Sequence, residues 1–80
     1  MTVESDVVAR VLRLASQQFG LPLEQLAPEQ DLFDALGIDS VQALELLSTL
    51  ERTFGVELPD YELAEVRSFA DLAERLGDRL

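Results

Sequence analysis

Apolar residues recur along much of the chain at spacings of three and four, which is the pattern of amphipathic helices. The first such stripe runs from about Glu4 to Phe19, and Gly20 followed by Pro22 is a strong stop signal. We therefore expect a first helix over about residues 4–19. Its apolar positions are Val7, Val8, Val11, Leu12, Ala15 and Phe19.

Residues 21–36 contain two prolines and scattered apolar residues that keep no sustained period. This pattern predicts a long loop that is pinned to the core by its apolar side chains. Structureless loops of this length are uncommon in compact domains. We therefore expect a short helical turn inside the loop, a functional role for it, or both.

A second helix is predicted between Gly37 and about Phe54, and Gly55 ends it. Asp39 stands at the N-cap position, and Gln42 follows three residues later in the reciprocal position of a capping box. The stripe that would face the core consists of Ala43, Leu46, Leu47, Leu50 and Phe54.

Two more helices are predicted in the last third of the chain. Pro59 and Asp60 suit the start of a short helix through roughly Val66, and Ser68-x-x-Asp71 is a second capping box that opens the last helix. The apolar stripe of that helix is Phe69, Leu72, Ala73, Leu76 and Leu80. No segment has the period of a strand. The expected fold class is all-α, a four-helix bundle whose third helix is short and whose first two helices are joined by a long loop.

The length and composition exclude several classes of protein. Eighty residues make one domain at most, so we expect a single domain over residues 1–80. No apolar run approaches the roughly 20 residues of a transmembrane helix, and the first residues carry acids and an Arg instead of the apolar stretch of a signal peptide. We expect a cytoplasmic, monomeric protein that does not bind membranes.

The residue types also limit the chemistry. The chain has no Cys and no His, so it has no disulfide, no thiolate and none of the commonest metal ligand. A serine nucleophile needs a neighbouring base such as His or Lys, and both are missing. Asp31, Asp34, Asp39 and Glu45 do not have the spacing of an EF-hand. We therefore expect no catalytic residues, no enzyme activity and no metal site.

The formal net charge of -10 is concentrated in one part of the chain. Between Glu24 and Glu65, Arg52 is the only base among eleven acids, whereas both ends of the chain are close to neutral. Such a field disfavours nucleic acid and anionic membranes as partners and favours basic protein surfaces. The simpler alternative is an acidic face that serves solubility.

One serine stands in a setting that suits chemistry. Ser40 follows Asp39 at the predicted start of the second helix, where unpaired backbone N–H groups and the positive end of the helix dipole favour an attached phosphodiester. Gly37 keeps side-chain bulk away, so an outside enzyme could reach the hydroxyl. The alternative is that Asp39 and Ser40 only start a helix.

The segment that contains Ser40 also resembles the attachment motif of the acyl carrier protein family, which includes peptidyl and aminoacyl carriers. Residues 36–41 read LGIDSV, and residues 54–60 read FGVELPD, which resembles the family's link to its third helix. Further matches flank the motif at Leu32, Phe33, Glu45, Leu46, Leu47, Leu50 and Glu51. The resemblance implies that a phosphopantetheinyl transferase esterifies Ser40 with 4'-phosphopantetheine from coenzyme A, which makes the chain a phosphoprotein.

The second helix also carries candidate partner residues. Val41 and Leu44 fall outside its core stripe, beside Glu45. They have the character of an apolar docking centre with a charged rim, although solitary apolar surface residues are also common. In the family this helix recognises partners, so the resemblance implies that role for Val41, Leu44, Glu45 and Glu51. The partners it implies are acyl-loading and synthase enzymes with basic docking surfaces.

We interpret the chain as a carrier that holds acyl groups as thioesters on its arm for polyketide, fatty-acid or hybrid biosynthesis. Gln42 stands where many members of the family have an acid, and Ser48 stands where fatty-acid carriers often have a large apolar residue. These departures from the family pattern favour a discrete carrier of a polyketide or hybrid pathway. The loop at Leu32 and Phe33 could shelter an apolar acyl chain. Two alternatives stay open, an aminoacyl or peptidyl carrier and a non-carrier acidic docking domain in which Ser40 is only a helix residue.

Overall fold

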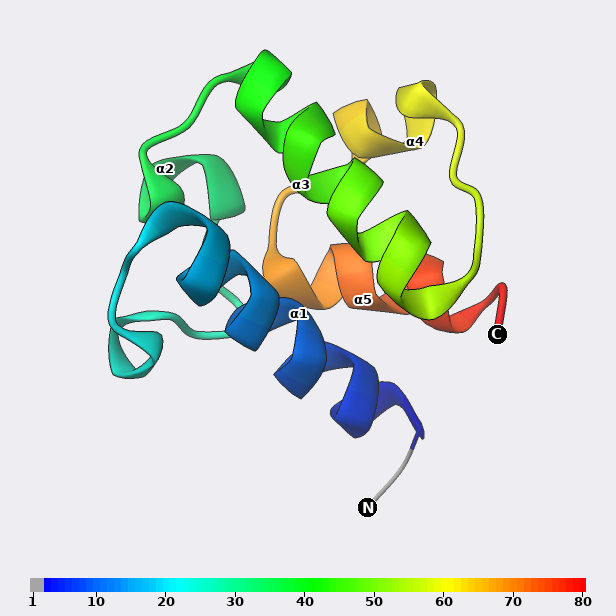
Figure 1. Ribbon diagram of the computed structural model, residues 1–80, viewed down its shortest axis with the longest axis horizontal. Helices are drawn as coiled ribbons and strands as arrows, with labels where there is room; N and C mark the ends of the chain where they lie inside the picture. Colours follow the sequence, from blue (N-terminus) through cyan, green and yellow to red (C-terminus); the bar gives the residue numbers. More distant parts are fainter. Residues whose placement is uncertain (1–2) are drawn as a thin grey trace.

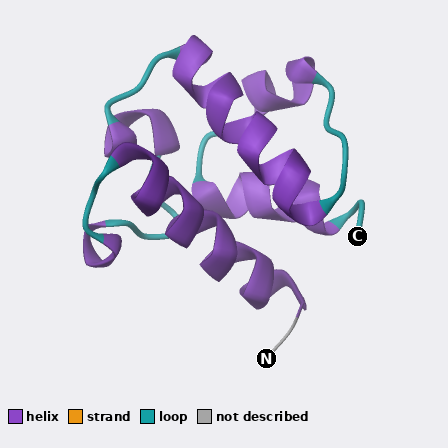
Figure 2. Cartoon of the chain, viewed as in Figure 1, coloured by secondary structure: helices purple, strands orange, loops and turns teal. Residues whose placement is uncertain are grey.

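The computed structural model describes the backbone of residues 3–80 and the side chains from Asp6 onward, and the fold is all-helical (Figures 1 and 2). Within the described residues there are five α-helices and one 3₁₀ turn, and no described residue belongs to a strand. The elements are α1 (Val3–Phe19), η1 (Leu23–Gln25), α2 (Leu32–Leu36), α3 (Ser40–Phe54), α4 (Asp60–Glu65) and α5 (Phe69–Gly77). The predicted all-α class is confirmed.

The core lies between three of these helices. In Figure 1, α1 and α3 run in opposite directions across the front of the view, and α5 lies behind them. Each helix turns its predicted apolar stripe inward, because burial of these side chains is the main favourable contribution to folding. The buried members are Val7, Val11 and Ala15 from α1, Ala43, Leu46, Leu47 and Leu50 from α3, and Phe69, Leu72, Ala73 and Leu76 from α5.

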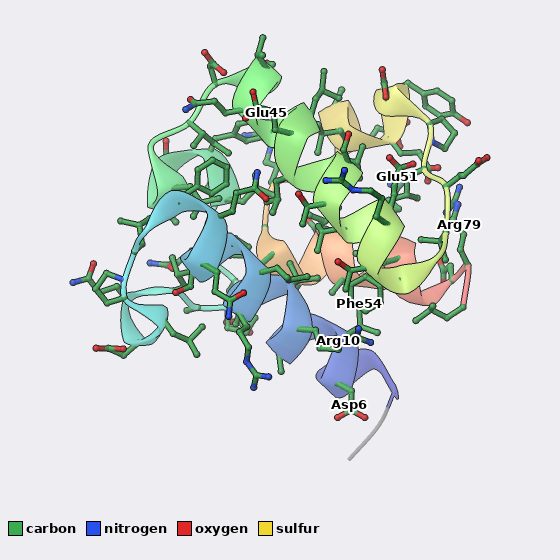
Figure 3. The ribbon with its side chains drawn as sticks, viewed as in Figure 1. Asp6, Arg10, Glu45, Glu51, Phe54 and Arg79 are labelled. Carbon is green, nitrogen blue, oxygen red and sulfur yellow. The ribbon has the colours of Figure 1, made fainter. Side chains whose placement is uncertain are left out.

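Two ends of the predicted stripes differ from expectation. Leu80 is 58% exposed because α5 ends at Gly77, so the prediction that Leu80 belongs to the core is wrong. Phe54 is half-buried at the end of α3, where the Arg10 guanidinium of α1 lies 4.3 Å from the centre of its ring (Figure 3). This cation–π contact joins α1 and α3 at the rim of the core.

The connection between α1 and α3 contains more helix than the sequence predicts. The expected helical turn is present as η1, but α2 is an additional helix of five residues. Asp31 caps it by accepting hydrogen bonds from the backbone N–H groups of Phe33 and Asp34, at 2.9 and 3.2 Å. Gly37 ends it in a left-handed conformation with φ 65°. A helix this short shows no apolar period, which is why the pattern predicts a loop.

Backbone hydrogen bonds tie this connection to the start of α5. The Leu32 N–H donates to the Arg67 carbonyl at 2.7 Å, and the Ala70 N–H donates to the Pro28 carbonyl at 2.8 Å. These two backbone hydrogen bonds fix the position of α2 relative to the core. The expected bundle of four helices with a short third member therefore corresponds to α1, α3, α4 and α5, with α2 added.

The short predicted helix after Pro59 is present as α4, six residues long. It packs against α3, which passes in front of it in Figure 1. Its buried anchors include Leu63, and Leu58 and Val66 are buried on either side of the helix. No helix of residues 3–80 combines the length and apolar character needed to cross a membrane.

Candidate functional site

The first turn of α3 is held by the predicted capping box. The Asp39 carboxylate accepts a hydrogen bond from the Gln42 backbone N–H at 2.9 Å, and the Gln42 side chain accepts one from the Asp39 N–H at 3.2 Å. Two of the N–H groups that a helix start leaves unpaired are thereby satisfied. The capping box gives Gln42 a structural role of its own.

Ser40 is the first residue of α3 and is exposed to solvent. Its hydroxyl takes no part in the capping box. Among the described residues, no acceptor is found for the backbone N–H groups of Ser40 and Val41. Unpaired N–H groups and the positive helix end stabilise a negative charge placed there. The position therefore fits a phosphodiester on the Ser40 oxygen.

Gly37 lies three residues before Ser40, at a position where the backbone conformation favours glycine. Its φ of 65° is in the left-handed region that favours glycine. A Cβ added to it would meet no atom within 4 Å, so close packing is not what requires the glycine. Gly37 thus closes α2 and turns the chain toward α3.

A cavity of ≈ 150 Å³ opens beside Ser40, between α2, α3 and α4. Most of its lining is apolar, and the carboxylate of Asp60 adds a charged group. The lining residues are Phe33, Ser40, Leu44, Asp60, Leu63 and Ala64. Sequence reasoning missed the three from α4, because only the folded chain brings them next to Ser40. A group attached to the serine would have an apolar space within reach.

The candidate docking residues on α3 are placed differently from one another. Val41 is 65% exposed, and Glu45 is exposed one turn further along the helix (Figure 3). Leu44 is half-buried, because it packs against the core and lines the cavity. Leu44 is therefore a cavity residue as much as a surface residue, which the helical pattern alone did not indicate.

Glu51 has a structural partner. Its carboxylate accepts a hydrogen bond from the Leu58 backbone N–H at 2.8 Å and so holds the α3–α4 connection against α3 (Figure 3). It also lines an open hollow at the end of α3, together with Ser48, Arg52, Gly55, Val56 and Glu57. Its expected role in partner recognition stays a prediction.

The charged side chains divide into two groups. The ion pairs found among the described residues join Arg75 of α5, and Arg79 just beyond its end, to Glu62 and Glu65 of α4. Glu45 and Glu51 of α3 are not among these paired groups. Within the described residues, no three His, Cys, Asp or Glu side chains are grouped so that they could hold a metal ion.

A sequence model of the family described as "Phosphopantetheine attachment site" matches residues 9–76 of the chain. The matched segment begins in α1 and ends in α5, and therefore includes α3 with Ser40. Most of the domain, and not only the short motif, follows the pattern of that family.

Curated relatives and a solved structure agree with this match. The chain is 33% identical over 75 residues to an acyl carrier protein of Syntrophobacter fumaroxidans, which covers 90% of this chain and 93% of that protein. It is 27% identical over 77 residues to an acyl carrier protein of Thermosynechococcus vestitus, with 96% and 95% covered. The structure of an acyl carrier protein from Enterococcus faecalis superimposes with a TM-score of 0.78 at 20% identity, over 99% of this chain and 100% of that one, which establishes the shared fold.

Proposed function

The chain belongs to the phosphopantetheine-attachment family, and we propose that it works as an acyl carrier whose 4'-phosphopantetheine arm is attached to Ser40. The family match confirms the resemblance and the cofactor that it implies. One observation carries the choice of residue. Ser40 stands exposed at the start of α3, next to unpaired N–H groups, with its hydroxyl outside the capping box.

In the attachment step the Ser40 Oγ attacks the phosphorus of coenzyme A that bears the pantetheine. A new oxygen–phosphorus bond forms, the pyrophosphate bond breaks, and adenosine 3',5'-bisphosphate leaves. The hydroxyl proton goes to a base on the phosphopantetheinyl transferase, because this chain has no His or Lys to accept it. The bound arm supplies a terminal thiol on which acyl groups are held as thioesters.

The role of the chain in this chemistry is to hold and present the arm. Gly37 and Asp39 shape the backbone that leads into the attachment point, and the N–H groups at the start of α3 stabilise the phosphodiester. The cavity next to Ser40 offers apolar walls at Phe33, Leu44 and Leu63 to an acyl chain. We place no catalytic step on the chain itself.

The difference from fatty-acid carriers at Ser48 favours a polyketide or hybrid pathway within this class. Ser48 is exposed on α3, so a change there alters the surface that partners meet and leaves the core intact. The proposed partners are the transferase and the acyl-loading and synthase enzymes with basic surfaces.

The attachment residue is tested by incubating the protein with coenzyme A and a promiscuous transferase. The intact mass should rise by one phosphopantetheine unit, and Ser40→Ala should gain nothing while keeping its helical circular dichroism. Thr53→Ala, which removes an exposed hydroxyl near the far end of the same helix, should load like the wild type and serves as the control. Loading of Ser40→Ala, or peptide mapping to another serine, would refute the assignment to Ser40, whereas a wild-type protein that gains no mass would support the docking-domain alternative.

The docking surface is tested through Glu45, which lies next to Val41 and Leu44 on α3. Glu45→Arg should slow association with a basic partner by about tenfold at low salt, because steering by charge acts on the association rate. The difference should shrink at higher salt, since screening acts within about 10 Å at 0.1 M. Stopped-flow association rates measure it. Glu74→Arg, an exposed acid on α5, is the matched control, and an equal slowing in both variants would mean that only net charge matters.

A further inference from the structure

Helix α4 has two faces with different tasks. Asp60, Leu63 and Ala64 are three and four residues apart, so they share one face, and this face forms a wall of the cavity beside Ser40. Glu62 and Glu65 share another face of the same helix, and both are paired with α5. The contacts of this second face with α5 therefore determine the position of the cavity wall that the first face forms.

Glu62 is an unusual acid because it is only 7% exposed. Its Oε1 accepts a hydrogen bond from Arg75 Nη1 at 3.0 Å, and its Oε2 is paired with Arg79 Nη2. The remaining amino group of Arg75 reaches Glu65 Oε2 at 3.1 Å. The hydrogen bonds to Glu62 and then to Glu65 raise the pKa of Arg75, which keeps its charge fixed. We call Glu62, Arg75 and Arg79 the Glu62 clamp.

Buried Leu58 and Val66 anchor the two ends of α4, and the clamp supplies the polar contacts that fix the helix between them. Six residues are too few to be stable as an isolated helix. Pro59 precedes α4 without a side-chain cap, whereas α5 starts with a complete capping box. Leu63 is the one buried apolar residue within α4, whereas α5 buries four, so apolar packing holds α4 less firmly than α5. Loss of either arginine would leave the buried carboxylate of Glu62 poorly compensated.

The size of the cavity makes this position important. A volume of ≈ 150 Å³ is below the roughly 300 Å³ at which pockets for small ligands begin. A longer acyl chain would find more room if one wall moved. Of the walls, α3 is fixed by the core and α2 by backbone hydrogen bonds, so α4 is the wall that can yield.

We propose that Glu62, Arg75 and Arg79 are positioning residues for the group carried on Ser40, and that by holding α4 against α5 they set the width of the cavity. The hold of the clamp on α4 is inferred from the ion pairs and does not depend on the proposed function. Its effect on the carried acyl group rests on the proposed function. Figure 3 shows Arg79 at the end of α5, on the side of the molecule where the chain passes from α3 to α4.

The hold on α4 is tested on the unmodified protein by amide hydrogen exchange. Glu62→Gln keeps the shape of the side chain and removes its charge, and it should speed exchange at Leu63 and Ala64 by about tenfold or more while amides of α1 and α3 change little. Glu74→Gln makes the same change in net charge on an exposed residue and should leave α4 unchanged. Equal acceleration throughout the chain, or none in α4, would overturn the proposal.

A milder pair of variants serves if Glu62→Gln does not fold. Arg79 has a side chain that is 33% exposed, so its replacement leaves the core intact. Arg79→Gln should speed exchange in α4, and Arg79→Lys, which keeps the charge, should restore most of the protection. If the two variants behave alike, charge does not hold α4 and the clamp is refuted.

The effect on cargo is tested on protein loaded from butyryl- or octanoyl-coenzyme A. Hydroxylamine cleaves an exposed thioester faster than a sheltered one. In Glu62→Gln the octanoyl group should become several-fold better protected relative to the butyryl group than in the wild type, and Glu74→Gln should keep the wild-type ratio. An unchanged ratio beside faster exchange in α4 would refute the control of cavity width. Failure of the wild type to load would refute attachment at Ser40, and the exchange result on unmodified protein would still decide the clamp.

Discussion

Helices α5 and α4 are both short, both follow α3 in the chain, and yet they are held by different forces. α5 buries four apolar side chains, packs mainly against α1 and starts with a complete capping box. α4 has no side-chain cap, borders a cavity, and is joined to α5 through ion pairs. Close apolar packing resists any change of volume, whereas a helix that borders a cavity can shift when the ion pairs that hold it are weakened. The comparison indicates that stability resides around α5 and adaptability around α4.

Truncation in the packed region should have the largest effect. Leu72 of α5 is 1% exposed, so Leu72→Ala should lower the free energy of unfolding by about 2–5 kcal/mol, from lost burial and the cavity left behind. Urea titration followed by circular dichroism measures the loss. A loss below about 1 kcal/mol would mean that the surroundings of α5 collapse as readily as those of α4.

Truncation beside the existing cavity should cost less. Leu44 is half-buried and already borders empty space, so Leu44→Ala should lower the free energy of unfolding by only about 1 kcal/mol. Leu47, on the same helix and 2% exposed, is the control, and Leu47→Ala should cost about 2–5 kcal/mol. Equal losses in the two variants would place Leu44 in the core and remove the contrast between the two sides of α3.

The smallest effect is expected at the cap of α5. Backbone N–H groups of Arg67 and then Ser68 donate to the Asp71 carboxylate and hold its pKa below the ordinary value of 3.8. A lowered pKa in the folded state contributes stability above pH 3.8, and this contribution is lost as the pH falls through the folded pKa. Because Asp71 is exposed, Asp71→Asn should cost only a few tenths of a kcal/mol at neutral pH, about 0.3. Melting temperatures of both proteins from pH 7 to pH 3 should converge in acid, and a constant difference would contradict the role of the charge.

The parts of the fold that depend on local signals could be predicted from the sequence. Asp39 with Gln42 and Ser68 with Asp71 each mark a helix start within four residues, and both capping boxes are present. Helix α2 could not be predicted in the same way, because five residues span too few turns to show a period. Its one local signal was Asp31 at the N-cap position.

The candidate site likewise combines features that local sequence signals predict with features that depend on tertiary packing. Ser40 could be placed at the start of α3 because capping is a property of neighbouring residues. The cavity wall at Leu63 and Ala64 could not be predicted, since it depends on how α4 approaches α3 after a change of chain direction. The burial of Glu62 was also beyond prediction, because acids are usually exposed and its partners come from a helix more than ten residues away.

The capping box at the start of α3 also bears on the relation between folding and modification of the protein. Asp39 and Gln42 complete the first turn without using the Ser40 oxygen, so esterifying that oxygen breaks none of their hydrogen bonds. A newly made chain can therefore form this turn before modification, so that a transferase would meet a folded turn and not a segment that it has to order. The same backbone would serve before attachment, after it, and through each cycle of loading and unloading.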